Sequence, residues 1–324
     1  MSAIDLRFDL SRFPQRYEAA LRQNLKERCF DAKWHYETPK QVAAWLRVHE
    51  VYSPARTDKE VQGIYRDAFE ALSRRTWKQV VSLGCGGAQK DVALFSKIAQ
   101  DVSGGLPTYT AIDIGSAMVL TALLAMRTSF PQLKTFGVVA DLVNVEEVDF
   151  LNDADTLFLL FGLIPNLEPP TFLKLLQRWK IKNGLISVNL VSERGMNEIL
   201  PQYDNLLTKQ WLSLLPQDLG FTVRPEEIEI AWQPCPHFPE LSRIEANYYL
   251  REDTEIYFAG ENFSFKKGEK LQLFYSYRYT KDQFASWLKS EKIEIAKSWI
   301  VSSQEEGVFY YKFQPPLAMR LLPV

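Results

Sequence analysis

The sequence of 324 residues predicts an α/β fold, in which a twisted, mostly parallel sheet is covered by helices and closed by a C-terminal hairpin. From about residue 77, short apolar segments alternate with segments of helical periodicity. This alternation is typical of parallel strands whose connections cross the faces of one sheet. The composition, 46% hydrophobic and 24% charged, suits a protein with a full core.

The N-terminal segment, residues 1 to about 60, is polar and aromatic with mostly helical periodicity. One helix begins near Pro39 and ends where Ser53 precedes Pro54, because the residue before a proline avoids the helical conformation. A second helix is predicted over 58–73. The strands predicted next are 79–83, 108–114, 135–140, 155–161 and 184–190, with helices after the first strand and over 117–128 and 172–179.

The regular alternation stops between residues 195 and 280. A helix is predicted over 208–215, and strands over 242–250, 254–258, 263–265 and 271–279 indicate an antiparallel region. A helix over 281–290 and a long hairpin formed by 293–301 and 308–313 end the pattern. A parallel sheet finished by such a hairpin is typical of a class I (Rossmann-like), seven-stranded methyltransferase core, whereas a nicotinamide-binding fold ends on another parallel strand.

Charge and cysteine content exclude several classes of function. The formal net charge of −2 gives no basic field for nucleic acid. Three cysteines, far apart and odd in number, exclude a disulfide framework and show no zinc-ligand spacing. The N-terminus shows no signal peptide, and the longest apolar stretch, 157–164, is too short for a bilayer. We expect a cytoplasmic monomer without a metal, nucleic-acid or membrane partner.

The sharpest local signal is the segment Val-Val-Ser-Leu-Gly-Cys-Gly-Gly, which contains Gly84 and Gly86. A strand that ends in Gly-x-Gly lets the backbone pass close to a ligand at the carboxyl edge of a sheet. A tight turn without a ligand is the alternative interpretation of this segment alone.

Acidic residues at the ends of the next two strands favour the ligand. Asp113 ends the strand over 108–114, where a carboxylate can accept both hydroxyl protons of a ribose. Asp141, followed by Leu142, comes after the next strand, where a carboxylate can receive the amino group of adenine. Each acid alone would more often cap a helix or lie in a loop. Together with the glycine turn they describe a pocket for adenosine.

Two adenosine cofactors remain, a nicotinamide dinucleotide and S-adenosyl-L-methionine. The complete GxGxxG fingerprint fails, because Gln89 occupies the third glycine position. Lys90 places a cation where the carboxylate of S-adenosylmethionine would lie, although a solvated lysine is an equal alternative. These residues and the terminal hairpin favour S-adenosylmethionine.

The sequence resembles the histidine Nα-methyltransferase family of ergothioneine biosynthesis over most of the chain. Besides the glycine turn and the two aspartates, the similar segments are Lys-Trp-His-Tyr (33–36), Glu-Val-Tyr-Ser-Pro-Ala-Arg (50–56), Leu-Phe-Gly-Leu-Ile-Pro-Asn-Leu (160–167), Gln-Tyr-Asp-Asn (202–205), Lys-Gly-Glu (267–269) and Ser-Tyr-Arg-Tyr (276–279). Their common order and spacing carry the resemblance.

The resemblance implies a methyltransferase core, 61–194 and 281–324, and a substrate-binding domain, 1–60 and 195–280. It also implies that Asn166 and Tyr203 hold the amine and carboxylate of an acceptor amino acid, with Tyr36 or Tyr52 nearby. An amide oxygen and a phenol can orient the lone pair of a neutral amine for an in-line displacement. Without the resemblance, Asn166 would be interpreted as a turn residue and Tyr203 as a half-buried tyrosine.

One departure from the family concerns the acceptor. Ser276 is retained, but Phe274 stands where the histidine enzymes carry an acidic residue that grips the imidazole. Loss of that carboxylate removes the partner of a cationic ring, and Phe274 offers apolar surface instead. The expected acceptor is an amino acid with an aromatic or apolar side chain, or an amine derived from one. A small-molecule acceptor of another kind, methylated on nitrogen or oxygen, and a non-catalytic scaffold are the alternatives.

Overall fold

The computed structural model describes residues 4–101, 105–145, 155–179, 181–191, 196–235, 238 and 240–313. The strands are β1 (Leu6–Phe8), β2 (Gln79–Leu83), β3 (Thr108–Asp113), β4 (Thr135–Val139), β5 (Thr156–Leu160), β6 (Asn183–Asn189), β7 (Glu229–Pro234), β8 (Ser242–Tyr249), β9 (Thr254–Phe258), β10 (Glu261–Phe265), β11 (Lys270–Arg278), β12 (Ile293–Ile300) and β13 (Glu306–Phe313). The α-helices are α1 (Pro14–Glu27), α2 (Pro39–Tyr52), α3 (Pro54–Thr57), α4 (Lys59–Ser73), α5 (Gln89–Asp101), α6 (Ser116–Ser129), α7 (Pro169–Arg178), α8 (Met196–Tyr203), α9 (Leu206–Asp218) and α10 (Lys281–Ser290). Short 3-10 helices include η1 (Leu10–Arg12), η2 (Ala32–Tyr36), η4 (Ile164–Asn166) and η5 (Pro225–Glu227).

The largest sheet has eight strands in the order β1-β4-β3-β2-β5-β6-β13-β12. Every pair from β1 to β6 is parallel, whereas β13 runs antiparallel to both β6 and β12. The chain runs outward from β2 to β3 and β4 and then returns to β5 on the other side of β2. Ligands of open α/β sheets bind at the carboxyl ends of the strands beside such a reversal. The topology confirms the predicted α/β class and the antiparallel C-terminal hairpin.

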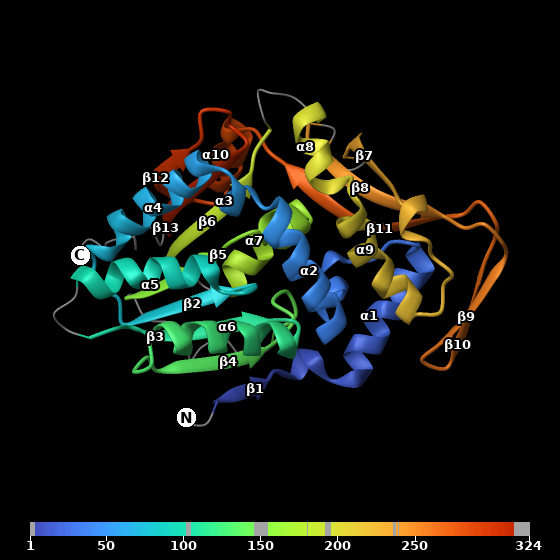
Figure 1. Cartoon of the computed structure of the whole chain (residues 1–324), viewed down its shortest axis with the longest axis horizontal. Coiled ribbons are helices and arrows are strands. Elements are labelled where there is room, and N and C mark those ends of the chain that lie inside the picture. Colours follow the sequence, from blue (N-terminus) through green and yellow to red (C-terminus); the bar gives the residue numbers. More distant parts are fainter. Residues whose placement is uncertain are drawn as a thin grey trace, which may run out of the picture.

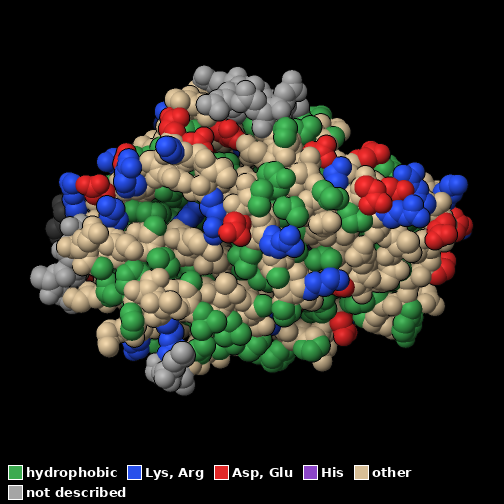
Figure 2. Space-filling model, in the orientation of Figure 1, with side chains coloured by type: hydrophobic (Ala, Val, Ile, Leu, Met, Phe, Trp, Pro, Cys, Tyr) green, Lys and Arg blue, Asp and Glu red, His purple; other side chains and the backbone are tan. Residues whose placement is uncertain are grey.

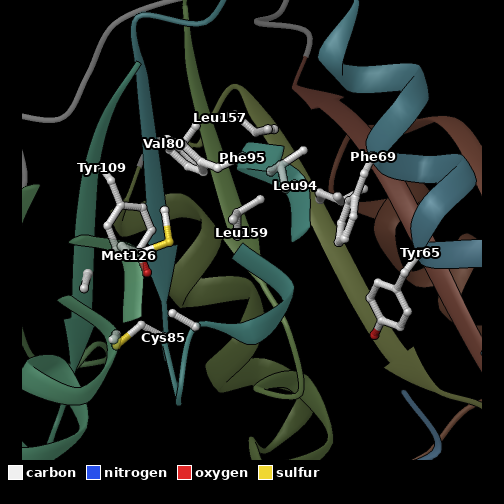
Figure 3. Close-up of a cluster of buried hydrophobic side chains, with 14 of the residues drawn as sticks. Tyr65, Phe69, Val80, Cys85, Leu94, Phe95, Tyr109, Met126, Leu157 and Leu159 are labelled. Atoms are coloured by element: carbon white, nitrogen blue, oxygen red, sulfur yellow. The ribbon is translucent and has the colours of Figure 1, made fainter. Parts of the chain in front are cut away.

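Helices cover both faces of this sheet (Figure 1). On one face α4, α5 and α6 pack on apolar side chains of β2, β3 and β5. Figure 3 shows Val80, Leu157 and Leu159 of these strands beside Leu94 and Phe95 of α5. On the other face α7 and α10 pack on the alternate side chains of the same strands. Since both faces are buried, the parallel strands are continuously apolar rather than alternating.

A second group of elements lies on the right of Figure 1. The antiparallel sheet β11-β8-β7 and the hairpin β9–β10 share a core with side chains from α1, η2 and α9. This group meets the large sheet at the carboxyl end of β6, where Leu190 forms a β-bridge with Tyr279. The division into a core and a substrate-binding domain remains a prediction, and its boundary at 194–195 lies outside the described residues.

The first strand departs from the sequence-based expectation. Residues 1 to about 60 were expected to be mostly helical, but Leu6, Arg7 and Phe8 pair with β4 and extend the edge of the large sheet. The surface shown in Figure 2 carries Lys and Arg interspersed with Asp and Glu, which agrees with the net charge of −2.

Candidate active site

The residues predicted for the site come together around one cavity of about 330 Å³. The cavity lies at the carboxyl ends of β2, β3 and β4 and extends toward β11 and α9. All twelve predicted site residues line it: Tyr36, Tyr52, Gly84, Gly86, Lys90, Asp113, Asp141, Leu142, Asn166, Tyr203, Phe274 and Ser276. Their individual roles stay predictions.

The glycine turn after β2 lines the cavity. Gly84 and Gly86 have φ angles of +68° and +51°, a backbone conformation that glycine adopts without steric cost. A Cβ at Gly86 would lie 3.3 Å from the ring of Trp45, which closes over the turn from α2. The turn therefore presents backbone to the cavity, as the sequence predicted.

Asp113, the last residue of β3, is buried beside this turn. Its Oδ1 accepts a hydrogen bond from the Ile114 amide at 2.8 Å, and its Oδ2 accepts one from the Gly86 amide at 3.3 Å. Burial raises the pKa of the Asp113 carboxyl to about 6. Both oxygens retain lone pairs, so the carboxylate can still accept hydroxyl protons from a ligand.

Asp141, just after β4, is held by several donors. Its carboxylate accepts hydrogen bonds from Lys33 Nζ at 2.9 Å, Asn144 Nδ2 at 2.9 Å and the Val143 amide at 3.1 Å. Burial alone would raise the pKa of Asp141, but Lys33 and the other donors hold it below the ordinary value. Asp141 is therefore an anion that can accept one further hydrogen bond at this end of the cavity. Lys33 lies in the Lys-Trp-His-Tyr segment, but the sequence did not indicate this contact.

Lys90 lines the cavity and contacts side chains of the protein. Its Nζ donates to the Tyr65 hydroxyl at 2.6 Å and lies 3.8 Å from Glu306 Oε1. Burial and the nearby Lys90 lower the pKa of His49, whose ring contacts that of Trp45 in a tilted arrangement, to about 3. The imidazole is therefore neutral at physiological pH. The predicted contact between Lys90 and a cofactor carboxylate remains a prediction.

This end of the cavity fits S-adenosylmethionine on the residues present. Three adjacent strands offer, in order, a backbone turn without side chains, a buried carboxylate with free lone pairs, and an ionised carboxylate. A turn, a ribose acceptor and an adenine acceptor in this order are what an adenosine group requires.

The other end of the cavity carries a polar cluster centred on Tyr203. The Tyr203 hydroxyl lies 3.2 Å from Ser276 Oγ and accepts hydrogen bonds at 3.3 Å from Asn189 Nδ2 and from Arg278 Nη2. Ser276 and Arg278 lie on β11, two residues apart, so their side chains share one face of the strand. Asn189 and Arg278 were missed by the sequence analysis, because only the packing of β6 against β11 brings them to Tyr203.

An aromatic wall faces this cluster. Phe274 lies on the same face of β11, is 5% exposed, and contacts Trp211 edge to face with a centroid distance of 5.6 Å. The ring centroid of Tyr36 lies 5.4 Å from that of Trp211 and 5.6 Å from that of Trp45. Burial and, to a lesser degree, Asp113 raise the pKa of Tyr36, so its phenol stays protonated. Trp211 was not predicted, since a tryptophan on an amphipathic helix is equally typical of a core.

Asn166 and Tyr52 complete the lining. Asn166 ends η4, and its Nδ2 donates a long hydrogen bond of 3.4 Å to the Gly162 carbonyl, which leaves the amide oxygen for a ligand. Tyr52 is the last residue of α2.

Comparison with protein families places the chain in one of them. The family model of the histidine-specific, S-adenosylmethionine-dependent methyltransferases matches residues 17–313. The chain belongs to this family. It is thus an S-adenosylmethionine-dependent methyltransferase, and S-adenosylmethionine is its cofactor, as the sequence predicted.

A curated relative of this methyltransferase is the N-methyltransferase imqF of Aspergillus flavus, 24% identical over 94% of this chain and 86% of the relative. Among solved structures, an S-adenosylmethionine-dependent methyltransferase of Clostridium acetobutylicum aligns over 84% of this chain and 99% of its own, with 13% identity and a TM-score of 0.46. Magnesium protoporphyrin IX methyltransferase of Synechocystis, solved with S-adenosylhomocysteine, aligns over 90% of this chain and all of its own, with 8% identity and a TM-score of 0.46.

Two other kinds of site are absent from the described residues of the methyltransferase. Within the described residues, no helix is long and apolar enough to cross a membrane. The same part of the chain holds no group of three or more His, Cys, Asp or Glu side chains placed to bind a metal ion.

Proposed function

We propose that this methyltransferase methylates the amine nitrogen of a free amino acid, or of a small molecule derived from one, whose side chain is aromatic or apolar. The observation that carries the proposal is the wall formed by Phe274, Trp211 and Tyr36 at the acceptor end of the cavity. In a histidine enzyme, the resemblance places a carboxylate at the position of Phe274. An imidazolium ring buried here without that carboxylate would lose hydration and gain no partner, so histidine is a poor acceptor.

The chain's own residues would act mainly by positioning. S-adenosylmethionine, when bound, supplies an electrophilic methyl group to the reaction. Asp113 and Asp141 hold the adenosine end, and Asn166 and Tyr203 orient the acceptor amine. Holding two reactants in line can contribute up to about 7–11 kcal/mol in favourable cases.

The cavity residues also bear on the proton that the amine must lose before it reacts. His49, with its pKa lowered to about 3, is too weak a base to take it at neutral pH. Tyr36 is a protonated phenol and cannot accept it as an anion. We propose that the amine reacts in its neutral form and that solvent takes its proton, since neither His49 nor Tyr36 can accept it.

A substrate panel tests the proposal. Formation of S-adenosylhomocysteine is measured with free amino acids and aromatic amines, histidine included, and the products are identified by mass. We expect an aromatic or apolar amino acid to be methylated faster than histidine, with mass gains in steps of one methyl group. Fastest turnover of histidine would contradict the proposed specificity. Cofactor binding without turnover of any member would move the acceptor to the alternative class of unrelated nitrogen or oxygen nucleophiles.

The site assignment has its own test in Asn166→Ala and Tyr203→Phe. Each change removes one polar group from the acceptor end and leaves the glycine turn and both aspartates intact. We expect kcat/KM for the acceptor to fall by about ten-fold or more, the value of one hydrogen bond to a polar ligand, with an unchanged Kd for S-adenosylhomocysteine. Unchanged turnover in both variants would remove these residues from the site.

A further inference from the structure

The face of β11 that points away from the cavity carries a second polar cluster. Tyr277 lies between Ser276 and Arg278, so strand alternation directs its side chain to the opposite face. It is fully buried, and its hydroxyl donates to Glu168 Oε2 at 2.7 Å. Burial, and then hydrogen bonds to Cys235 and Glu168, raise the pKa of Tyr277, so the phenol keeps the proton that it donates.

Glu168 belongs to the segment that carries the predicted acceptor residue Asn166. It follows η4 by two residues and is the residue before α7, although its side chain caps no amide of that helix. A second contact supports its carboxylate, because Arg243 Nη1 lies 3.5 Å from Glu168 Oε1. The bond between Tyr277 and Glu168 thus joins β11 directly to the η4–α7 turn.

Arg243 is held rigidly at this junction. Its Nε donates to Glu245 Oε1 at 2.7 Å, and its Nη1 donates to the Tyr277 hydroxyl at 3.2 Å. Burial alone would lower the pKa of Arg243, but its bonds to Glu245 raise it, so the guanidinium stays charged. On the β8–β11 side, the cluster therefore has the Tyr277 hydroxyl as a hydrogen-bond donor and the Arg243 guanidinium as a positive charge. On the side of the turn it has the Glu168 carboxylate.

We propose that Tyr277 is a positioning residue: by its bond to Glu168 it fixes the η4–α7 turn, and with it Asn166, against the strand that carries Ser276. The distance between the two sides of the acceptor end then depends on a contact that lies outside the cavity. The inference rests on the proposed acceptor role of Asn166 and Ser276. The bond between Tyr277 and Glu168 is a feature of the fold in either case.

The chain offers a matched control in Tyr279, which lies two residues after Tyr277 and directly after the end of β11. Tyr279 is also buried, but its hydroxyl has no hydrogen-bond partner among the described residues. Tyr277→Phe and Tyr279→Phe therefore remove the same atom from two buried tyrosines that are two residues apart, and only the first breaks a bond to the turn.

The first measurement needs no acceptor. Amide hydrogen exchange is followed for the peptide 162–168, in which the Asn166 and Leu167 amides bond to the Leu163 and Ile164 carbonyls. We expect exchange in Tyr277→Phe to be about ten-fold faster than in the wild-type protein, the factor that one hydrogen bond to a charged group contributes. Tyr279→Phe should exchange as the wild type does. Equal exchange in the two variants would overturn the proposal.

The second measurement separates positioning from general destabilisation. With the best acceptor of the substrate panel, kcat/KM should fall about ten-fold in Tyr277→Phe, while the Kd for S-adenosylhomocysteine stays unchanged. A parallel loss of cofactor affinity would show a merely structural role and overturn the inference. If Asn166→Ala leaves acceptor kinetics intact while the exchange result holds, the proposed acceptor role of Asn166 fails and the turn contact stands.

Glu168 gives a second pair of variants should Tyr277→Phe fold poorly. Glu168→Gln keeps an oxygen that can accept from Tyr277 and should retain most of the exchange protection. Glu168→Ala removes the carboxylate that accepts the hydrogen bond from Tyr277 and should reproduce the effect of Tyr277→Phe. Equal behaviour of the two Glu168 variants would contradict the bond as the cause.

Discussion

Burial raises the pKa of the Asp113 carboxyl to about 6, so this residue changes charge within a pH range in which the protein can be assayed. The neighbouring titratable groups Cys85 and Tyr36 stay neutral there, because burial raises the pKa of both. The protonated carboxyl has fewer lone pairs for the ribose hydroxyls than the carboxylate. We expect affinity for S-adenosylhomocysteine to be constant above about pH 7 and to fall as the pH drops through about 6. Titration calorimetry between pH 5 and 8 measures the Kd for S-adenosylhomocysteine at each pH.

Asp113→Asn is the control for that profile. The amide cannot ionise, and one of its two polar atoms is a donor that faces the Gly86 or Ile114 amide. The variant should bind S-adenosylhomocysteine about ten-fold or more weakly, with no pH dependence near 6. A variant that keeps the wild-type pH profile would assign the ionisation to another group.

Phe274 allows a test of acceptor specificity at a single position. Phe274→Glu restores a carboxylate beside Ser276, in a site that is 5% exposed. A buried carboxylate without a partner is costly, whereas an imidazolium ring would pair with it. We expect turnover of aromatic acceptors to fall at least about ten-fold and histidine to be methylated, as measured on the same panel. Phe274→Leu, which stays apolar, should not gain histidine. Histidine turnover in the leucine variant would show that size, and not charge, sets the selection.

The cofactor residues that were predicted from the chain itself share one property: each lies at or shortly after the end of a predicted strand, whereas Asn166 and Tyr203 were singled out through the family resemblance. Gly84 and Asp141 come directly after predicted strands and Asp113 lies at the end of one, and the carboxyl ends of parallel strands meet at one edge of a sheet. Lys33 and Trp211 could not be found in this way. Each reaches the cavity through packing between segments far apart in the sequence, Lys33 against Asp141 and Trp211 against Phe274.

At the scale of elements, the predicted strands of the large sheet agree with the structure to within one or two residues at most ends. β2, for example, was predicted over 79–83 and is Gln79–Leu83. Continuous apolar runs bounded by turns identify strands buried on both faces. The missed strands were β1, three residues long, and β7, whose exposure pattern is mixed. β1 depends on pairing with the distant strand β4, whereas β7 pairs with the next strand, β8, but ends at Pro234 and shows no clear alternation.

The contact between η2 and the β3–α6 turn predicts how one substitution would propagate. A Cβ at Gly115 would lie 2.1 Å from the backbone oxygen of Tyr36, so Gly115→Ala must displace η2, which carries both Lys33 and Tyr36. The φ of Gly115 is −95°, so alanine adds no backbone strain there, only the clash. We expect a loss of about 1–3 kcal/mol in the free energy of unfolding, measured by urea denaturation, and a raised KM for the acceptor.

Gly63 is the matched control, because alanine there meets no close atom. It lies inside α4, and an added Cβ would come no closer than 3.7 Å to Arg66 Nη2. Gly63→Ala should stabilise the protein by about 0.5–1 kcal/mol, since glycine loses more conformational freedom in a helix. Equal stabilities of the two alanine variants would show that η2 is free to move away from Gly115.

At the scale of the whole molecule, the cavity lies where the large sheet and the group of elements around β11 meet. Asp113 and Asp141 come from one side, whereas Tyr203, Phe274 and Ser276 come from the other. Segments of the N-terminal 60 residues join both sides, because Lys33 pairs with Asp141 while Tyr36 packs on Trp211. We therefore expect a ligand at the adenosine end to be coupled through η2 to the packing of the acceptor end.

This coupling predicts the effect of ligand on global unfolding. At a free concentration of 100 times its Kd, S-adenosylhomocysteine should raise the free energy of unfolding by about 2.7 kcal/mol, because it binds only the folded state. Unfolding is followed by circular dichroism of the whole chain and by tryptophan fluorescence, to which Trp211 contributes. If η2 couples the two sides, ligand should shift the unfolding transitions seen by the two signals together. Asp113→Asn, which should bind about ten-fold more weakly, should be stabilised by only about 1.4 kcal/mol at the same ligand concentration. Two transitions, of which ligand moves only one, would show instead that the sheet holding Asp113 unfolds independently of the elements around Trp211.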